Sequence, residues 1–109
     1  MKRSHFVRLR DLLDAVAEMI EGADFASYRG DVKLKRAVER CVEIVSEASR
    51  HLSPAATDRY PDQPWSEIAA IGNLLRHEYQ RVDDLIMWKI ASRSLPALRA
   101  AVSEMLGER

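Results

Sequence analysis

Apolar residues recur at steps of three and four along most of this chain. No stretch of useful length alternates apolar and polar residues with a period of two. One such pattern runs from Phe6 to Ile20, and another runs from Leu34 to Leu52. Steps of three and four return a side chain to the same face of an α-helix, whereas a strand needs a step of two. The spacing therefore predicts an all-α fold, an antiparallel up-and-down bundle of four to five helices.

Residues that favour helix ends flank these patterns. The segment SPAATDRYPDQP holds three of the four prolines and predicts a break with a helical turn in its middle. Capping residues, a proline and two glycines predict where the other helices begin and end. The first helix spans residues 3–21 and stops at Gly22, and the second spans residues 31–52 with Asp31 as its cap. A third helix begins at Pro64, a fourth is capped by Asp83, and a fifth is capped by Ser94 and ends at Gly107.

Composition narrows the class of protein. A length of 109 residues predicts a single domain, residues 1–109. Lysine plus arginine equals aspartate plus glutamate at 17 each, so the whole-molecule charge does not favour nucleic acid or a membrane. No stretch approaches the ~20 apolar residues of a membrane span or forms a signal-peptide core. With one cysteine and no internal disulfide, we expect a cytoplasmic protein without membrane contact.

Several residues look chemical but have simpler interpretations. Cys41 lies on an apolar helix face, where a buried inert thiol is expected. His5 and His51 show no partner at metal-ligand spacing, so we expect surface or capping roles, no metal site and no cofactor. Trp65 and Trp88 lie at helical spacing among aliphatic residues, which favours packing over base stacking.

A cationic cluster opens the predicted helix 31–52. A helix N-terminus disfavours cations, so these side chains need another explanation. They form either a solvated face or an edge that contacts RNA phosphates, and both readings stay open: Arg29, Lys33, Lys35 and Arg36.

The segment NLLRHEYQRVD, residues 73–83, concentrates titratable side chains at a helix end. Asn73 and His77 are four apart and share a helix face. Tyr79 can converge with His77 only if the helix ends near His77, and the capping aspartate at position 83 makes that break expected. Histidine suits proton transfer near neutral pH, yet an ordinary polar helix end would look similar.

Four segments together carry a family resemblance. FVRLRDLLDAV, AVERCVEIVSEAS, PWSEIAAIGNLLRHEYQRVD and WKIASRSLPAL resemble successive helices of HepT-like toxins of the HEPN superfamily. The family signature is an arginine, four to six residues, a histidine, any residue and a tyrosine, of which HEY supplies His77 and Tyr79. Gly72 occupies the place where close relatives carry the arginine, and Arg76 is one helical turn later. We therefore expect the Arg76 guanidinium to replace that of the family arginine.

The resemblance also implies a function. It implies a dimeric endoribonuclease that needs no metal, with His77 as general acid or base, Arg76 stabilising phosphoryl charge and Asn73 orienting the imidazole or contacting phosphate. An MNT-type nucleotidyltransferase antitoxin encoded beside the toxin would add AMP to Tyr79; otherwise, the ring of Tyr79 packs on the bundle. The runner-up is a catalytically silent HEPN-fold module, silent because Gly72 replaced the arginine, that binds its partner or RNA. A third reading is an unrelated bundle in which HEY occurs by chance.

Overall fold

Every regular element that the computed structural model describes is helical. The described part of the chain is residues 3–107, and the prediction of an all-α antiparallel bundle is confirmed there. None of its helices is both long enough and apolar enough to cross a bilayer. The elements in chain order are α1 (Arg3–Ile20), α2 (Phe25–Arg29), α3 (Val32–Arg50), α4 (Pro54–Asp58), α5 (Trp65–His77), the 3₁₀ turn η1 (Tyr79–Arg81), α6 (Asp84–Lys89), the π-helical segment η2 (Ile90–Ser94) and α7 (Leu95–Met105).

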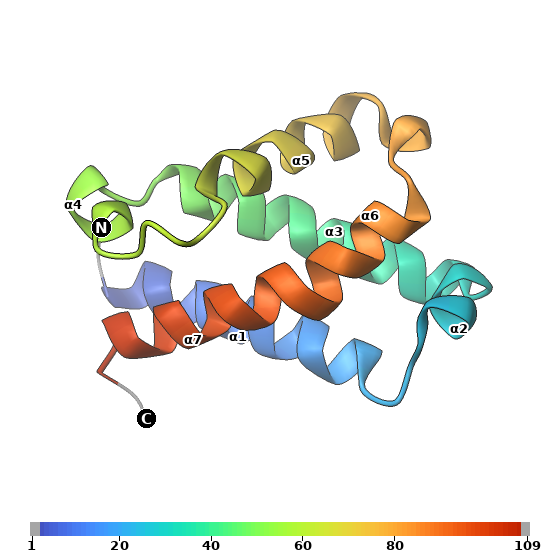
Figure 1. Ribbon diagram of the computed structural model, residues 1–109, viewed down its shortest axis with the longest axis horizontal. Coiled ribbons are helices and arrows are strands. Elements are labelled where there is room, and N and C mark those ends of the chain that lie inside the picture. Colours follow the sequence, from blue (N-terminus) through green and yellow to red (C-terminus); the bar gives the residue numbers. More distant parts are fainter. Residues whose placement is uncertain (1–2, 108–109) are drawn as a thin grey trace.

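Four rods run up and down and pack side by side. Helix α3 runs antiparallel to both α1 and α5, and α7 returns beside α1 (Figure 1). The fourth rod consists of α6, η2 and α7 in continuous succession. The end of α5, η1 and the start of α6 lie at the same end of the molecule as α2 and the start of α3, opposite the chain termini (Figure 1).

The core comes from the periodic apolar faces of the rods. Each long helix turns one face inward, as the spacing of three and four predicts. The buried side chains include Leu9, Leu13 and Val16 of α1, Val38, Val42 and Val45 of α3, Ile68, Ile71 and Leu75 of α5, and Leu95, Leu98 and Val102 of α7.

Most predicted helix ends are confirmed. The Asp31 carboxylate accepts a hydrogen bond from the backbone N–H of Leu34 at 3.0 Å, and Asp83 caps α6 in the same manner. Gly22 and Gly107 follow α1 and α7 with φ of 78° and 74°, the left-handed conformation that ends helices and favours glycine. The helical turn within the proline-rich segment is α4, and α5 begins at Trp65, one residue after the predicted Pro64.

Ser94 was expected to cap a new helix, and that prediction is wrong. Its backbone is helical, with φ −69° and ψ −44°, and its side chain makes no capping hydrogen bond. The chain instead continues through a π turn, in which the N–H of Leu95 bonds the carbonyl of Ile90. Pro96 lacks an N–H, and its ring would crowd the carbonyl four residues earlier; the wider π turn relieves that crowding. Burial of Ala91 and Leu95 keeps the rod continuous.

Helix α2 is an element that the periodicity did not predict. Five residues are too few to show a helical repeat. A reciprocal cap defines the helix: the Asp24 carboxylate accepts from the N–H of Ser27 at 2.8 Å, and the Ser27 hydroxyl accepts from the N–H of Asp24 at 3.0 Å. Aspartate followed three residues later by serine was the readable signal.

Candidate functional site

Helix α5 ends at His77, where the sequence required a break. Glu78 leaves the helical conformation, with φ −147° and ψ 45°, while its N–H still bonds the carbonyl of Leu74 at 2.7 Å. The 3₁₀ turn η1 follows immediately, and Asp83 starts α6. The local sequence therefore produces two helix boundaries within six residues, and His77 occupies the first.

His77 is exposed and unengaged. Within residues 3–107, no hydrogen bond or ion pair holds its imidazole, so both ring nitrogens can reach a ligand. Tyr79 begins η1, but its side chain lies outside the described residues.

Arg76 is held on the outer face of α5 by two acceptors. Its Nη2 donates to Asn73 Oδ1 at 2.8 Å, and its Nη1 donates to Glu47 Oε2 of α3 at 3.2 Å. The structure thus pairs Asn73 with Arg76, the residue one turn away, rather than with His77. Fixed in this way, the guanidinium lies one residue before the imidazole in the chain, and its remaining N–H groups stay available to an anion.

Glu47 contacts Arg76, and the sequence did not single it out. Its Oε1 lies 3.4 Å from His51 Nε2, so the carboxylate joins His51 to Arg76. The hydrogen bond from His51, followed by that from Arg76, lowers the pKa of Glu47 from its ordinary value. The statement that His51 lacks a carboxylate partner is therefore wrong. Glu47 and His51 are four apart on α3, a visible signal, whereas the contact with Arg76 depends on how α3 meets α5.

Gly72 lies where α5 packs tightly against Ser46 of α3. It is buried, and a Cβ added there would lie 2.6 Å from Ser46 Cβ, a distance that packed atoms do not adopt. The Ser46 hydroxyl also donates to the carbonyl of Ala69 at 3.1 Å, which fixes α3 against α5. Position 72 therefore faces α3, and an arginine placed there would have to displace Ser46 before it could reach solvent.

The four cations at the start of α3 do not form one uniform patch. Lys35 pairs with Asp84 of α6 at 3.4 Å, and Arg36 pairs with Glu39 at 2.8 Å. Arg29 and Lys33 are exposed, and within the described chain neither has a hydrogen bond or ion pair. The end of α2 and the start of α3, which carry these four residues, lie at the same end of the bundle as the end of α5 (Figure 1).

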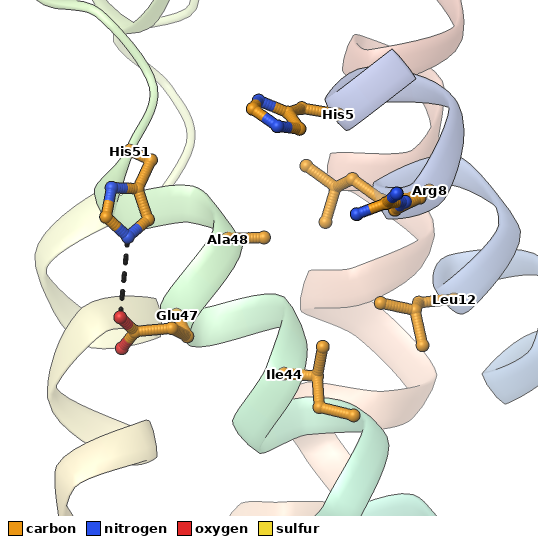
Figure 2. Close-up of a pocket in the computed structure, with 8 residues that line it drawn as sticks. His5, Arg8, Leu12, Ile44, Glu47, Ala48 and His51 are labelled. Carbon is orange, nitrogen blue, oxygen red and sulfur yellow. Dashed lines mark ion pairs between the residues drawn. The ribbon is translucent and has the colours of Figure 1, made fainter. Parts of the chain in front are cut away.

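A separate cleft of 260 Å³ opens between α1 and α3. Figure 2 shows His5 and Arg8 on α1 facing His51 and Glu47 on α3, with Ala48 between them and with Leu12 and Ile44 further along the two helices. None of the HEY residues lines this cleft. Glu47 lines it and also pairs with Arg76, the residue before HEY. Among residues 3–107, no group of three or more His, Cys, Asp or Glu side chains could hold a metal ion.

The remaining chemical-looking residues have structural roles. Cys41 is half-buried against the core, and burial raises the pKa of its thiol, which disfavours the reactive thiolate. Trp65 packs on the core and donates through Nε1 to the carbonyl of Tyr60 at 3.0 Å. Trp88 lies against Tyr28, with ring centroids 5.3 Å apart. These observations support packing for both tryptophans.

Comparison with known proteins identifies the family. The "Ribonuclease HepT-like" family profile matches residues 9–105. The chain belongs to the HepT-like ribonuclease family of the HEPN superfamily. It is 33% identical to the "Probable ribonuclease HepT" of Thermococcus cleftensis, over 96% of this chain and 98% of that protein. A Methanocaldococcus jannaschii protein that is named a "Putative RNase" is 30% identical, over 93% of this chain and 95% of its own.

The HepT-like profile covers the whole candidate site. Asn73, Arg76, His77 and Tyr79 all fall within the matched residues. The reading of HEY as a chance motif in an unrelated bundle is therefore wrong. No solved structure matches the chain.

Proposed function

We propose that this chain is a metal-independent endoribonuclease and the toxin of a toxin–antitoxin pair. The observation that carries the proposal is membership of a ribonuclease family, joined to an exposed His77 at a helix end and to Arg76, the preceding residue, which Asn73 and Glu47 hold in place. Histidine suits proton transfer near neutral pH, and a guanidinium suits charge on phosphoryl oxygens. The proposed setting is the cytoplasm, where the enzyme meets RNA.

The proposed reaction uses the substrate's own 2′-hydroxyl. His77 takes the proton of that hydroxyl, and O2′ attacks the adjacent phosphorus while the P–O5′ bond breaks. The products are a 2′,3′-cyclic phosphate and a 5′-hydroxyl, whose proton comes from a general acid. Arg76 stabilises the negative charge that builds on the phosphoryl oxygens. The exposed Arg29 and Lys33 would contact flanking phosphates from the same end of the bundle.

A two-fold dimer would supply the general acid as the His77 of a second protomer. Large apolar side chains stay exposed on both sides of the motif, Leu74 on α5 and Leu85 and Ile86 on α6. Their burial would bring two copies of His77 together across the axis. Light scattering is expected to give twice the chain mass at micromolar concentration. A monomer at that concentration, combined with active cleavage, would rule out the composite site.

The test of cleavage is a pair of single substitutions. His77→Ala and Arg76→Ala should each abolish cleavage of cellular RNA and relieve growth arrest, while circular dichroism shows unchanged helicity. Arg81 pairs only with Glu78 among the described residues, so Arg81→Ala serves as a matched control on the same segment. Cleavage that survives His77→Ala would refute the assignment.

The second candidate is a silent HEPN-fold module that binds its partner or RNA. The observation in its favour is Gly72, because the family arginine is missing and position 72 faces Ser46 rather than solvent. A wild-type chain that neither cleaves RNA nor slows growth would favour this candidate. Gly72→Arg is not expected to restore activity, because the added side chain would meet Ser46 and should separate α3 from α5.

Neutralisation is proposed to occur at Tyr79. A nucleotidyltransferase partner would position ATP so that the tyrosine oxygen attacks the α-phosphorus; the new O–P bond forms, pyrophosphate leaves and the phenol proton passes to a base. The attached AMP would then compete with RNA phosphate for Arg76. Mass spectrometry after co-expression should show additions of one AMP, all absent in Tyr79→Phe. A neutralised but unmodified toxin would mean that the partner acts by steric binding.

A further inference from the structure

A polar hollow lies beside the HEY segment. It measures 320 Å³ and lies between the first turns of α3, the 3₁₀ turn η1 and the start of α6. Its lining residues are Lys35, Arg36, Glu39, Gln80, Val82 and Asp84. Because Gln80 follows Tyr79 directly, an RNA strand whose phosphate lay at His77 could place a neighbouring nucleotide over this hollow.

The charges of the hollow are balanced. Lys35 pairs with Asp84 across the two helices at 3.4 Å, and Arg36 pairs with Glu39 along α3 at 2.8 Å. The side chains of Lys35 and Glu39 are only 16% and 14% exposed, so both are largely buried in the wall of the hollow. Two carboxylates would repel a bare phosphate. The hollow is instead suited to a neutral group that offers donors and acceptors along one edge.

We propose that the hollow binds a guanine base of the RNA, next to the cleaved phosphate. The proposal rests on the proposed ribonuclease function and deepens it. Guanine carries the acceptors O6 and N7, which suit Lys35, and the donors N1–H and the 2-amino group, which suit a carboxylate. Glu39 keeps a free lone pair while it binds Arg36, because an ionised carboxylate has about four acceptor positions. Sequence-specific proteins commonly read unstacked RNA bases along such edges.

The test measures binding on RNA that cannot be cleaved. Nine-residue 2′-O-methyl oligouridylates carry a central guanine, inosine or uracil, and fluorescence anisotropy gives their dissociation constants on the wild-type chain. Inosine lacks the 2-amino group, so it should bind about tenfold more weakly than guanine, and uracil more weakly still. In Glu39→Gln the guanine and inosine constants should agree within about twofold.

Matched variants separate recognition from folding. Glu43 pairs with Arg40 one turn further along α3 with the same spacing as Glu39 and Arg36, but it lies outside the hollow, so Glu43→Gln should keep the tenfold preference. Circular dichroism should show wild-type helicity in both variants, so that a lost preference reports lost recognition and not unfolding.

The outcomes distinguish this site from the ribonuclease activity. Equal constants for the guanine and inosine RNAs on the wild-type chain overturn the guanine site, whether or not RNA is cleaved. A preference for guanine that is unaffected by Glu39→Gln overturns it also. A chain that prefers guanine and loses the preference in Glu39→Gln, yet never cleaves unmodified RNA, keeps the guanine site and loses the ribonuclease proposal.

Discussion

Gly72→Ala is expected to destabilise the protein, although alanine is the better helix former. Replacing an exposed helical glycine by alanine stabilises a helix by about 1 kcal/mol. At position 72 the added Cβ would lie 2.6 Å from Ser46 Cβ, and overpacking of this kind costs about 1–3 kcal/mol. Moving Ser46 aside would also break its hydrogen bond to Ala69, worth about 1 kcal/mol.

The three contributions leave a net loss of about 1–3 kcal/mol, since the propensity gain offsets the lost hydrogen bond. For a chain of this size, the melting temperature should fall by about 4–12 °C. Thermal melts followed by circular dichroism at 222 nm give the shift. In the double variant Gly72→Ala with Ser46→Gly, removal of the serine side chain makes room for the new Cβ. The free energy of unfolding should therefore fall by at least about 1 kcal/mol less than the sum of the losses in the two single variants.

Ala70 provides the control for helix propensity, because it is exposed on α5 two residues from Gly72. Ala70→Gly should cost about 1 kcal/mol through propensity alone. If Gly72→Ala melts at or above the wild-type temperature while Ala70→Gly behaves as expected, then α3 and α5 do not meet at Ser46 as described. That result would refute the close approach and reopen position 72 to an arginine.

Three further outcomes follow from the contacts. Carbon-detected NMR titration should give Glu47 a lowered pKa, which should rise in His51→Ala and, to a smaller extent, in Arg76→Ala. Because the folded pKa lies below the unfolded one, the pairing stabilises the fold at pH values above the ordinary glutamate pKa. This stabilisation is lost as the pH falls through the lowered pKa. Asp83→Ala should reduce the free energy of unfolding by about 1 kcal/mol in urea titrations, whereas Asp83→Asn should retain most of it. Asn73→Ala should slow RNA cleavage less than Arg76→Ala, for which the expected loss is about 10²–10³-fold in single-turnover assays; equal losses would show that Asn73 does more than fix the guanidinium.

Local chemistry made much of the fold predictable. Asp31 and Asp83 cap helices through hydrogen bonds that span two or three residues, so a short stretch of sequence reveals them. Ser94 has the same capping chemistry, but burial of Ala91 and Leu95 keeps the chain helical through that position. Tertiary packing overrode the local signal there, and packing is what a single sequence does not reveal.

The candidate site divides in the same way. The shared face of Asn73 and His77 follows from helical spacing, and the break after His77 follows from the need to start α6. The contact between Arg76 and Glu47 joins residues 29 apart and exists because Gly72 lets α5 lie close to Ser46. Its prediction would have required the register of α3 against α5, which the pattern of apolar residues alone does not fix.

The end of the bundle formed by the start of α1 and the end of α7 can be engineered without changing the HEY segment. Arg3 donates through Nη1 to the carbonyl of Leu106 at 3.1 Å, so the start of α1 and the end of α7 are neighbours. They lie at the opposite end of the bundle from the C-terminal end of α5 (Figure 1). A purification tag, a fluorescent reporter or a surface tether attached at either end would project away from the HEY segment. A short peptide could also join the ends while the chain is reopened in the loop at residues 59–63, and such a circular permutant should keep every contact around Arg76.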